Sequence, residues 1–240
     1  MKLSRQEEIT QPFVLTSDDL NKVYANLQKW LSMINFDISC KDSLDREFST
    51  LEDLLQFENP PQKDIRSFCL RGYSHDHQTR ASIYFNINSS RNILISIEGE
   101  EDAVMAINNS LEECLSAIRP WYHILSRINF YIFFYLLLIV PLIIIILGIT
   151  IGIIKLDSNQ SLSPVIVIHS IFKGLLWGFT PPVFGYIFSW IQKTYFPMGS
   201  FAIGQGVKRN KDKEIIRTVI IIGFSLSLIA AIIAALIFAL

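Results

Sequence analysis

Two arginines and two tyrosines have the side chains that bind phosphates and stack on nucleobases. They lie on two neighbouring predicted strands, residues 65–73 and 80–88, on the face opposite the apolar side chains. The four residues are Arg71, Tyr73, Arg80 and Tyr84. Guanidinium groups pair with phosphates and aromatic rings stack on bases, so this face predicts a nucleotide or oligonucleotide ligand. The competing interpretation is a solvated sheet face without a ligand.

A second candidate is the sequence His75-Asp76-His77, in the predicted loop between the same two strands. Two imidazoles around a carboxylate can hold a metal ion or relay a proton, whereas a polar turn needs no ligand. The three cysteines are scattered without a CxxC motif, which favours neither a zinc site nor a disulfide framework. No P-loop, nucleophile elbow or metalloprotease motif is present. We therefore expect no enzyme, no metal and no cofactor.

Polar residues within the apolar C-terminal half form a third candidate. A charge inside a bilayer is costly and commonly faces a cavity or a partner, so Lys173 is a candidate functional residue. The residues that could line or gate a pore are His169, Lys173, Thr180, Pro181 and Pro182. The alternative is that the ammonium of Lys173 extends to the membrane interface.

Small residues recur every four positions near the C-terminus. They are Gly223, Ser227, Ala231 and Ala235. This spacing lets helix backbones approach closely in lipid, which predicts packing against another helix of the chain or against a second copy.

The elements that position the first candidates belong to a predicted α+β domain, residues 1–120, with an antiparallel sheet and two main helices. Helical spacing of apolar residues begins at Ser17 and again at Asp102. The predicted strands cover residues 36–40, 65–73, 80–88 and 92–98. Ser49 and Glu52 predict a capping box for a short additional helix.

Residues 121–240 predict an all-α transmembrane domain of about three spans. The predicted spans cover residues 129–154, 163–191 and 218–240. About 20 apolar residues suffice to cross the hydrocarbon core as a helix. Because residues 163–191 contain a proline pair, a re-entrant pair of half-helices is the alternative for that segment.

The two halves of the chain differ in charge. Residues 1–120 carry 12 Lys and Arg against 19 Asp and Glu, while residues 121–240 carry 9 against 3. The acidity of the first half argues against non-specific nucleic-acid binding. The basic segment of residues 192–217 predicts a cytoplasmic loop. We therefore expect a multi-pass protein of the cell inner membrane with a cytoplasmic N-terminal domain.

The segment YFPMGSFAIGQGVKR, residues 195–209, joins the last two predicted spans. Its aromatic, glycine and basic residues predict an interfacial elbow, with a purely structural loop as the alternative. In this segment and in its layout the chain resembles uncharacterised bacterial membrane proteins with a small cytosolic domain ahead of the membrane region. That layout is similar to membrane effectors of anti-phage defence, including the Hailong type, in which a nucleic-acid signal controls a channel. The resemblance implies a sensor domain coupled to an oligomeric pore, and it supplies no ligand residue.

Two functional hypotheses follow. In the first, the chain is a subunit of an oligomeric membrane channel whose cytosolic domain binds a ligand or protein partner and gates ion flux. Coupling would run from the helix of residues 102–119 into the first span. In the second, the chain is a membrane-anchored adaptor that recruits a cytosolic protein partner and forms no pore. Both expect the lipid bilayer as a partner, and the first expects a homo-oligomer.

Overall fold

The computed structural model describes residues 2–89, 91–150 and 181–239 of the chain. The strands are β1 (Lys2–Ile9), β2 (Phe13–Thr16), β3 (Met33–Cys40), β4 (Asp45–Phe48), β5 (Ile65–Tyr73), β6 (Arg80–Asn86), β7 (Ile93–Glu100) and β8 (Gly199–Ala202). The helices are α1 (Ser17–Leu27), α2 (Leu51–Leu55), α3 (Glu101–Ala117), α4 (Phe130–Thr150) and α6 (Gln205–Ala239), with short 3-10 turns at Pro61–Lys63 and Leu125–Arg127. Residues 181–195 are also helical.

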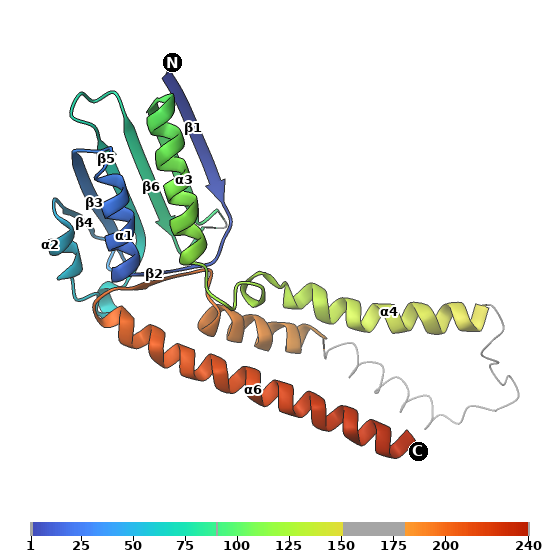
Figure 1. Cartoon of the computed structure of the whole chain (residues 1–240). Coiled ribbons are helices and arrows are strands. Elements are labelled where there is room, and N and C mark those ends of the chain that lie inside the picture. The colour runs from blue at the N-terminus through green and yellow to red at the C-terminus, as the bar shows by residue number, and fades with distance from the viewer. Residues whose placement is uncertain (1, 90, 151–180, 240) are drawn as a thin grey trace, which may run out of the picture. The chain divides into compact units, whose positions relative to one another are not determined.

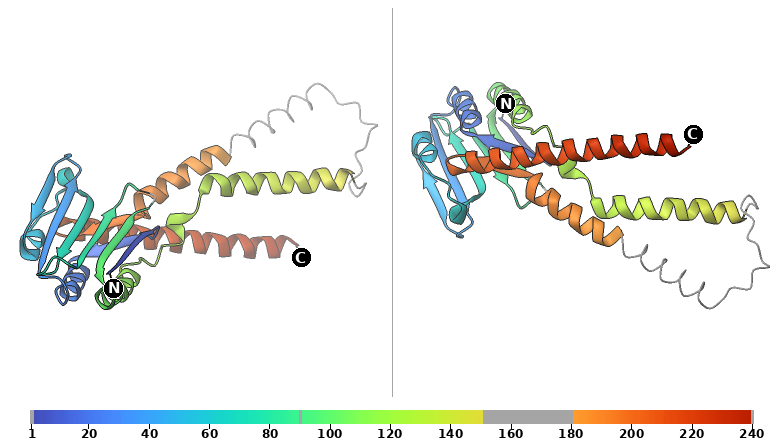
Figure 2. Two further views of the ribbon diagram at one scale, coloured as in Figure 1. Left: turned by 90° about the horizontal axis from the view of Figure 1, so that it is seen from above. Right: turned by 90° about the horizontal axis from the view of Figure 1, so that it is seen from below.

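The predicted α+β N-terminal domain is confirmed. Six strands form one sheet in the order β1-β7-β6-β5-β3-β4, and every neighbouring pair is antiparallel. Helices α1 and α3 cover one face of this sheet, as the views in Figure 1 and Figure 2 show. The apolar side chains of β5, β6 and β7 point toward these helices, so the opposite face carries their polar residues.

Two helices begin one residue away from their predicted caps. Thr16 caps α1, because its hydroxyl accepts from Asp19 N while the Asp19 carboxylate accepts from Thr16 N. Thr50 caps α2 by accepting from Asp53 N, so the predicted capping box of Ser49 and Glu52 is replaced by its neighbouring pair. Threonine and serine both serve as N-caps, and spacing alone does not separate adjacent candidates.

The predicted elbow is part of the folded domain rather than a loop. Its strand β8 pairs in parallel with β2, so that Phe13 lies opposite Gly199 and Leu15 opposite Phe201. The ring of Phe201 packs 5.5 Å from that of Phe13 and 6.4 Å from that of Phe68. Residues separated by nearly the whole chain therefore complete one core.

The compact units differ from the predicted division at residue 120. One unit comprises Met1–Ser126 together with Tyr195–Leu240, and the other comprises Arg127–Thr194. In the second unit, Phe134 packs against Phe184 and Phe188, with ring centroids 5.8 and 5.2 Å apart. Gln192 Nε2 also donates a 2.8 Å hydrogen bond to Ile128 O.

The prediction of an all-α domain with three spans is wrong. Among the described residues, only α6, over Gln205–Ala231, is long and apolar enough to cross a membrane. In α4 the stretch that meets the same apolar criterion, Phe130–Val140, is shorter. A run without charge is necessary for a span, but it does not guarantee one long helix. What α6 supports is membrane association through a single helix.

Candidate functional site

The four predicted ligand residues do share the uncovered face of the sheet. Tyr73 lies opposite Arg80 in the pairing of β5 with β6, and Tyr84 lies four residues further along β6, opposite Cys69. Arg71 is directly opposite Ser82, so the two arginines occupy adjacent rows of the face. The alternation rule therefore placed these side chains correctly relative to one another.

Both arginines have carboxylate partners. Arg71 donates to Asp37 on β3 at 2.5 and 2.9 Å, and this bond raises the pKa of the guanidinium. Arg80 Nε donates to Glu98 on β7 at 2.8 Å. Both arginine side chains are more than half exposed. Exposed pairs of this kind contribute at most about 1 kcal/mol, so an anionic ligand can compete for either guanidinium.

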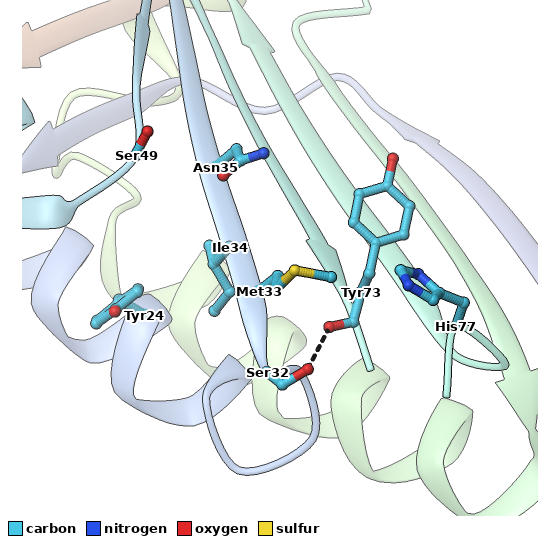
Figure 3. Close-up of a pocket in the computed structure, with 8 residues that line it drawn as sticks. All are labelled: Tyr24, Ser32, Met33, Ile34, Asn35, Ser49, Tyr73 and His77. Atoms are coloured by element: carbon cyan, nitrogen blue, oxygen red, sulfur yellow. Dashed lines mark hydrogen bonds between the residues drawn. The ribbon is translucent and has the colours of Figure 1, made fainter. Parts of the chain in front are cut away.

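A hollow of about 500 Å³ opens beside Tyr73, where β3 extends beyond the end of β4 (Figure 3). The lining residues are Tyr24, Ser32, Met33, Ile34, Asn35, Ser49, Tyr73 and His77. The rings of Tyr73 and His77 lie 6.2 Å apart, and Ser32 Oγ donates to Tyr73 O at 3.3 Å. The aromatic and amide groups of the hollow can accommodate a planar ring, whereas Arg71 and Arg80 are not among its lining residues.

The sequence His75-Asp76-His77 forms a polar turn. The Asp76 carboxylate accepts from Ser74 Oγ at 2.5 Å and from Gln78 N at 3.1 Å. The serine bond holds the pKa of Asp76 below its ordinary value. His77 adopts a left-handed φ of 56°, and within the described residues no group of three His, Cys, Asp or Glu side chains could hold a metal.

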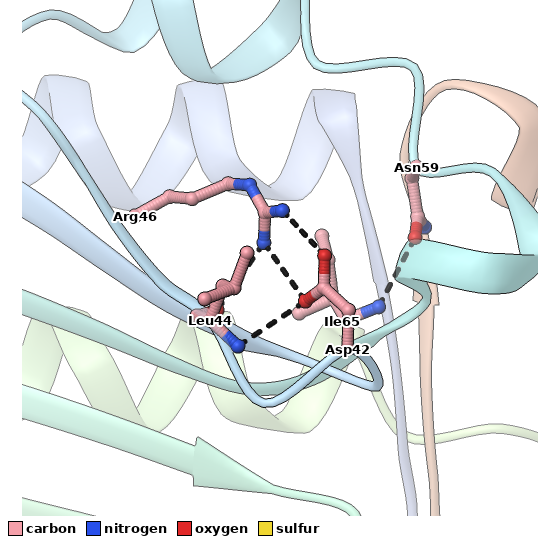
Figure 4. Close-up of polar contacts among 5 residues, drawn as sticks. All are labelled: Asp42, Leu44, Arg46, Asn59 and Ile65. Atoms are coloured by element: carbon pink, nitrogen blue, oxygen red, sulfur yellow. Dashed lines mark hydrogen bonds and ion pairs between the residues drawn. The ribbon is translucent and has the colours of Figure 1, made fainter.

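Two buried asparagines clamp the elbow at its two ends. Asn92 Nδ2 donates to Met198 O at 3.0 Å, just before β8. Asn59 Nδ2 donates to Phe201 O and Ile203 O at 3.3 and 3.2 Å. Asn59 Oδ1 also accepts from the Ile65 amide, as Figure 4 shows. An unmade bond at such buried groups costs about 1–3 kcal/mol each, so both asparagines tie the elbow firmly to the sheet.

The first turns of α6 continue this attachment. Arg209 donates to Asn59 O at 2.7 Å and to the Asp64 carboxylate at 2.5 Å. Gln205 N donates to Glu58 O at 2.6 Å. The start of the apolar helix is therefore bonded to the segment that leads into β5.

A buried arginine holds the next part of α6. Arg217 is only 1 % exposed; its guanidinium lies 4.3 Å from the centre of the Tyr122 ring and donates to Tyr195 O. Its counter-ion is Glu214, at 2.6 Å, and the same carboxylate accepts from Trp121 Nε1 at 2.6 Å. Arg217 thus joins α6 to the segments immediately before and after the second unit.

Burial changes the acid–base properties of this region. Burial raises the pKa of the Tyr122 phenol. Burial lowers the pKa of the Lys213 ammonium, and the positive charge of Arg217 acts in the same direction. Lys213 and Arg217 were counted as cytoplasmic loop charges in the sequence, but here they belong to a packed junction.

The structure describes only some of the remaining predicted residues. His169, Lys173 and Thr180 lie outside the described residues, while Pro181 and Pro182 belong to the helical residues 181–195. Of the small-residue series, Gly223 and Ser227 lie on α6, and a Cβ added at Gly223 would meet nothing within 4 Å. Ser227 Oγ donates back to Gly223 O at 2.8 Å. Their role in packing stays a prediction.

Sequence reasoning missed the residues that hold the elbow. Asn59, Asn92, Arg209 and Arg217 each act through partners that are distant in the chain. The available signal was the density of glycine and buried-type aromatic residues in the elbow, which suits a folded segment as well as an interfacial one. Comparison with protein-family models, with curated proteins and with solved structures gave no match in any of the three.

Proposed function

We propose that the chain is a non-enzymatic membrane effector. Its α+β domain lies in the cytoplasm and binds a ligand or a protein partner, and α6 carries the response into the inner membrane. Several copies assemble so that their α6 helices regulate ion flux. This assignment belongs to the same class as the anti-phage effectors that the layout resembles.

One observation carries the proposal: a single helix joins the sheet domain to the apolar segment. Helix α6 begins at Gln205, where it is bonded to Glu58, and runs to Ala239 without interruption. From Thr218 onward it extends about 33 Å, which matches a hydrocarbon core of about 30 Å. A movement of the domain must therefore displace the membrane helix.

This route differs from the one expected from the sequence. Helix α3 ends at Ala117, and only a 3-10 turn lies between it and the start of α4 at Phe130. An interrupted connection transmits rotation poorly, whereas α6 is continuous. We therefore assign coupling to α6 rather than to the helix of residues 102–119.

The ligand surface in this proposal is the uncovered face with Arg71, Tyr73, Arg80 and Tyr84, together with the adjoining hollow. An anionic ligand would displace the Asp37 and Glu98 carboxylates from the two arginines. Differential binding to two states of the domain supplies the free energy for gating.

The test is ion flux in liposomes that contain the full chain, with mononucleotides and oligonucleotides of up to four units as probes. We expect one probe class to change flux and Arg80→Gln to raise the concentration required. Arg209→Gln, which breaks the bond to Asp64, should keep probe binding but lose most of the flux response. Lys208→Gln, at an exposed neighbouring position with the same charge change, should behave as wild type.

The adaptor hypothesis remains the second candidate because, among the described residues, one helix is both long and apolar enough to cross a membrane. It expects a detergent-solubilised monomer, no flux with any probe, and recovery of a defined protein partner. That set of results would contradict the effector proposal.

A further inference from the structure

The outer edge of β3 is only partly covered by its neighbour in the sheet. Strand β3 extends over Met33–Cys40, but β4 ends at Phe48 and pairs only with residues 36–39 of β3. Within the described part of the chain, residues 33–35 therefore border no strand on that side. The same three residues line the hollow of about 500 Å³ in Figure 3, so the uncovered edge opens directly into this hollow.

The backbone of Ile34 directs its hydrogen-bonding groups toward the uncovered edge. Cys40 N donates to Leu44 O, at the end of the turn into β4. Lys41 N donates in the opposite direction, to Asp64 O just before β5. Successive residues of a strand bond to opposite neighbours, and the pairing of β3 with β4 contains no shift, so Ile34 has the orientation of Cys40. An uncovered N–H and C=O of this kind form a template for another strand.

The hollow also offers sites for side chains on both faces of the sheet. Tyr24 comes from α1 and borders the face that the helices cover, whereas Met33 and Tyr73 are paired on the open face (Figure 3). Met33 is 48 % exposed although it is apolar. Among the described residues that line the hollow, none is Asp, Glu, Lys or Arg. Side chains that enter the hollow are therefore expected to be uncharged.

We propose that this edge binds an extended, uncharged peptide segment of a protein partner as an additional strand. The segment continues the line of β4 along residues 33–35, a length of about 10 Å, and its backbone exchanges hydrogen bonds with Ile34. Its successive side chains enter beside Tyr24 and beside Met33. A planar ring that pairs with Ile34 would lie in the plane of the sheet and leave both of these sites empty, which favours a peptide.

The peptide site rests on the proposed function, in which the α+β domain binds a ligand or a protein partner, and it names the chemistry of that partner. Arg71 and Arg80 do not line the hollow, so the arginine-bearing face stays available to an anionic ligand. The two surfaces can therefore be tested separately.

The experiment measures binding of capped pentapeptides to the full chain in detergent, by fluorescence anisotropy. The probes have the alternating sequence Xaa-Thr-Xaa-Thr-Xaa, with Val, Leu or Phe as Xaa. We expect at least one probe to bind and to slow hydrogen exchange in the segment that contains Ile34. N-methylation of alternate peptide residues removes the N–H groups of one strand edge only. Methylation at one parity should weaken binding about tenfold, whereas methylation at the other parity should leave it unchanged.

Two lysine variants provide a matched comparison on the protein. Met33→Lys places a charge at the uncovered edge and should weaken peptide binding about tenfold. Met105→Lys makes the same replacement at an exposed methionine of α3 and should bind as wild type. Both methionines are exposed, so both variants should keep the unfolding transition of the wild type.

Equal weakening by methylation at both parities would overturn the strand addition, and so would equal effects of the two lysine variants. Failure of every pentapeptide to protect the segment around Ile34 would also refute it. Protection by a mononucleotide alone would assign the hollow to a nucleobase instead. A chain that responds to nucleotides in the flux assay but binds no peptide would retain the proposed function and refute only this site. Peptide binding without any flux response would retain this site and favour the adaptor.

Discussion

At the scale of single residues, the strongest constraint is the buried guanidinium of Arg217. It touches Tyr122, Tyr195 and Glu214, which come from three different parts of the chain. A buried charge keeps its free energy low only while its partners are in place, so this residue fixes the position of α6 more strictly than apolar contacts would.

Replacement of Arg217 by methionine should destabilise the sheet domain by about 2–3 kcal/mol. The substitution keeps much of the side-chain volume, but the Tyr195 carbonyl loses its Arg217 donor and Glu214 loses its counter-ion and keeps only Trp121. Denaturant unfolding of the detergent-solubilised chain measures the effect. Lys208→Met, at an exposed site on the same helix, serves as the matched control, and equal loss in both variants would contradict the junction.

Asp42 should give the domain a stability that depends on pH. The guanidinium of Arg46 bonds Asp42 at 2.6 and 3.2 Å (Figure 4) and holds the pKa of that carboxyl below its ordinary 3.8. A depressed pKa stabilises the folded state above pH 3.8, and this contribution is lost as the pH falls through the folded value. Asp42→Asn should therefore be less stable than wild type at pH 7 and equal to it near pH 2. A difference that persists at pH 2, in urea unfolding at both values, would rule out this linkage.

At the scale of elements, a strand could be predicted from the sequence only where apolar and polar residues alternate along it. The bounds of β5 were predicted correctly because its residues from Phe68 to Tyr73 alternate between the two faces and turn residues flank the strand. Strand β1 was missed because Arg5 and Glu7 share a face with Leu3 and Ile9. The apolar residues of β1 therefore do not alternate with polar ones along the strand. Strand β8 has four residues and a parallel partner far away in sequence, so it has no local signal.

The same limit applies to the candidate site. Alternation sufficed to place Arg71 and Arg80 on one face, but the carboxylates that pair with them depend on strand order. Strand β3 lies beside β5 although β4 and α2 separate them in sequence. The shared face of these side chains could therefore be predicted, whereas its ion pairs and the hollow beside Tyr73 could not.

The turn between β8 and α6 should tolerate no side chain at Gly204. This residue has a φ of +53°, and a Cβ there would lie 2.5 Å from Glu58 O. Gly204→Ala should therefore destabilise the domain by about 2 kcal/mol or more, through backbone strain and displacement of the elbow. Gly223→Ala places the same methyl group in open space and should leave the domain's unfolding unchanged. Thermal unfolding of the two variants in one detergent provides the comparison, and similar melting temperatures would refute the elbow geometry.

At the scale of the whole molecule, the contrast in charge between the halves of the chain does not mark a boundary between folded units. Arg209, from the basic half, pairs with Asp64 in the acidic half, and Phe201 fills the core beside Phe13. Among the described residues, this ion pair and this core contact join the two halves into one folded unit. The contacts that attach the start of α6 to the sheet domain therefore also contribute to the stability of that domain.

A direct consequence is that residues 1–120 should not form a stable domain alone. Removal of Phe201 and Ile203, which are almost fully buried, exposes the apolar surface of Phe13 and Phe68. It also leaves the Asn59 amide without its two carbonyl partners, while Asn92 loses Met198 O and keeps Gln11 O. Burial of each large apolar side chain contributes about 1.5–3 kcal/mol, which is a large fraction of the stability of a small domain. Replacement of residues 127–194 by a flexible Gly-Ser linker, with the chain ended at Arg217, should restore a cooperative unfolding transition. Circular dichroism of both chains tests this prediction. A cooperative transition of equal stability in residues 1–120 would show that the elbow is not required for the fold. Absence of a transition in the linked chain would show that the second unit is required.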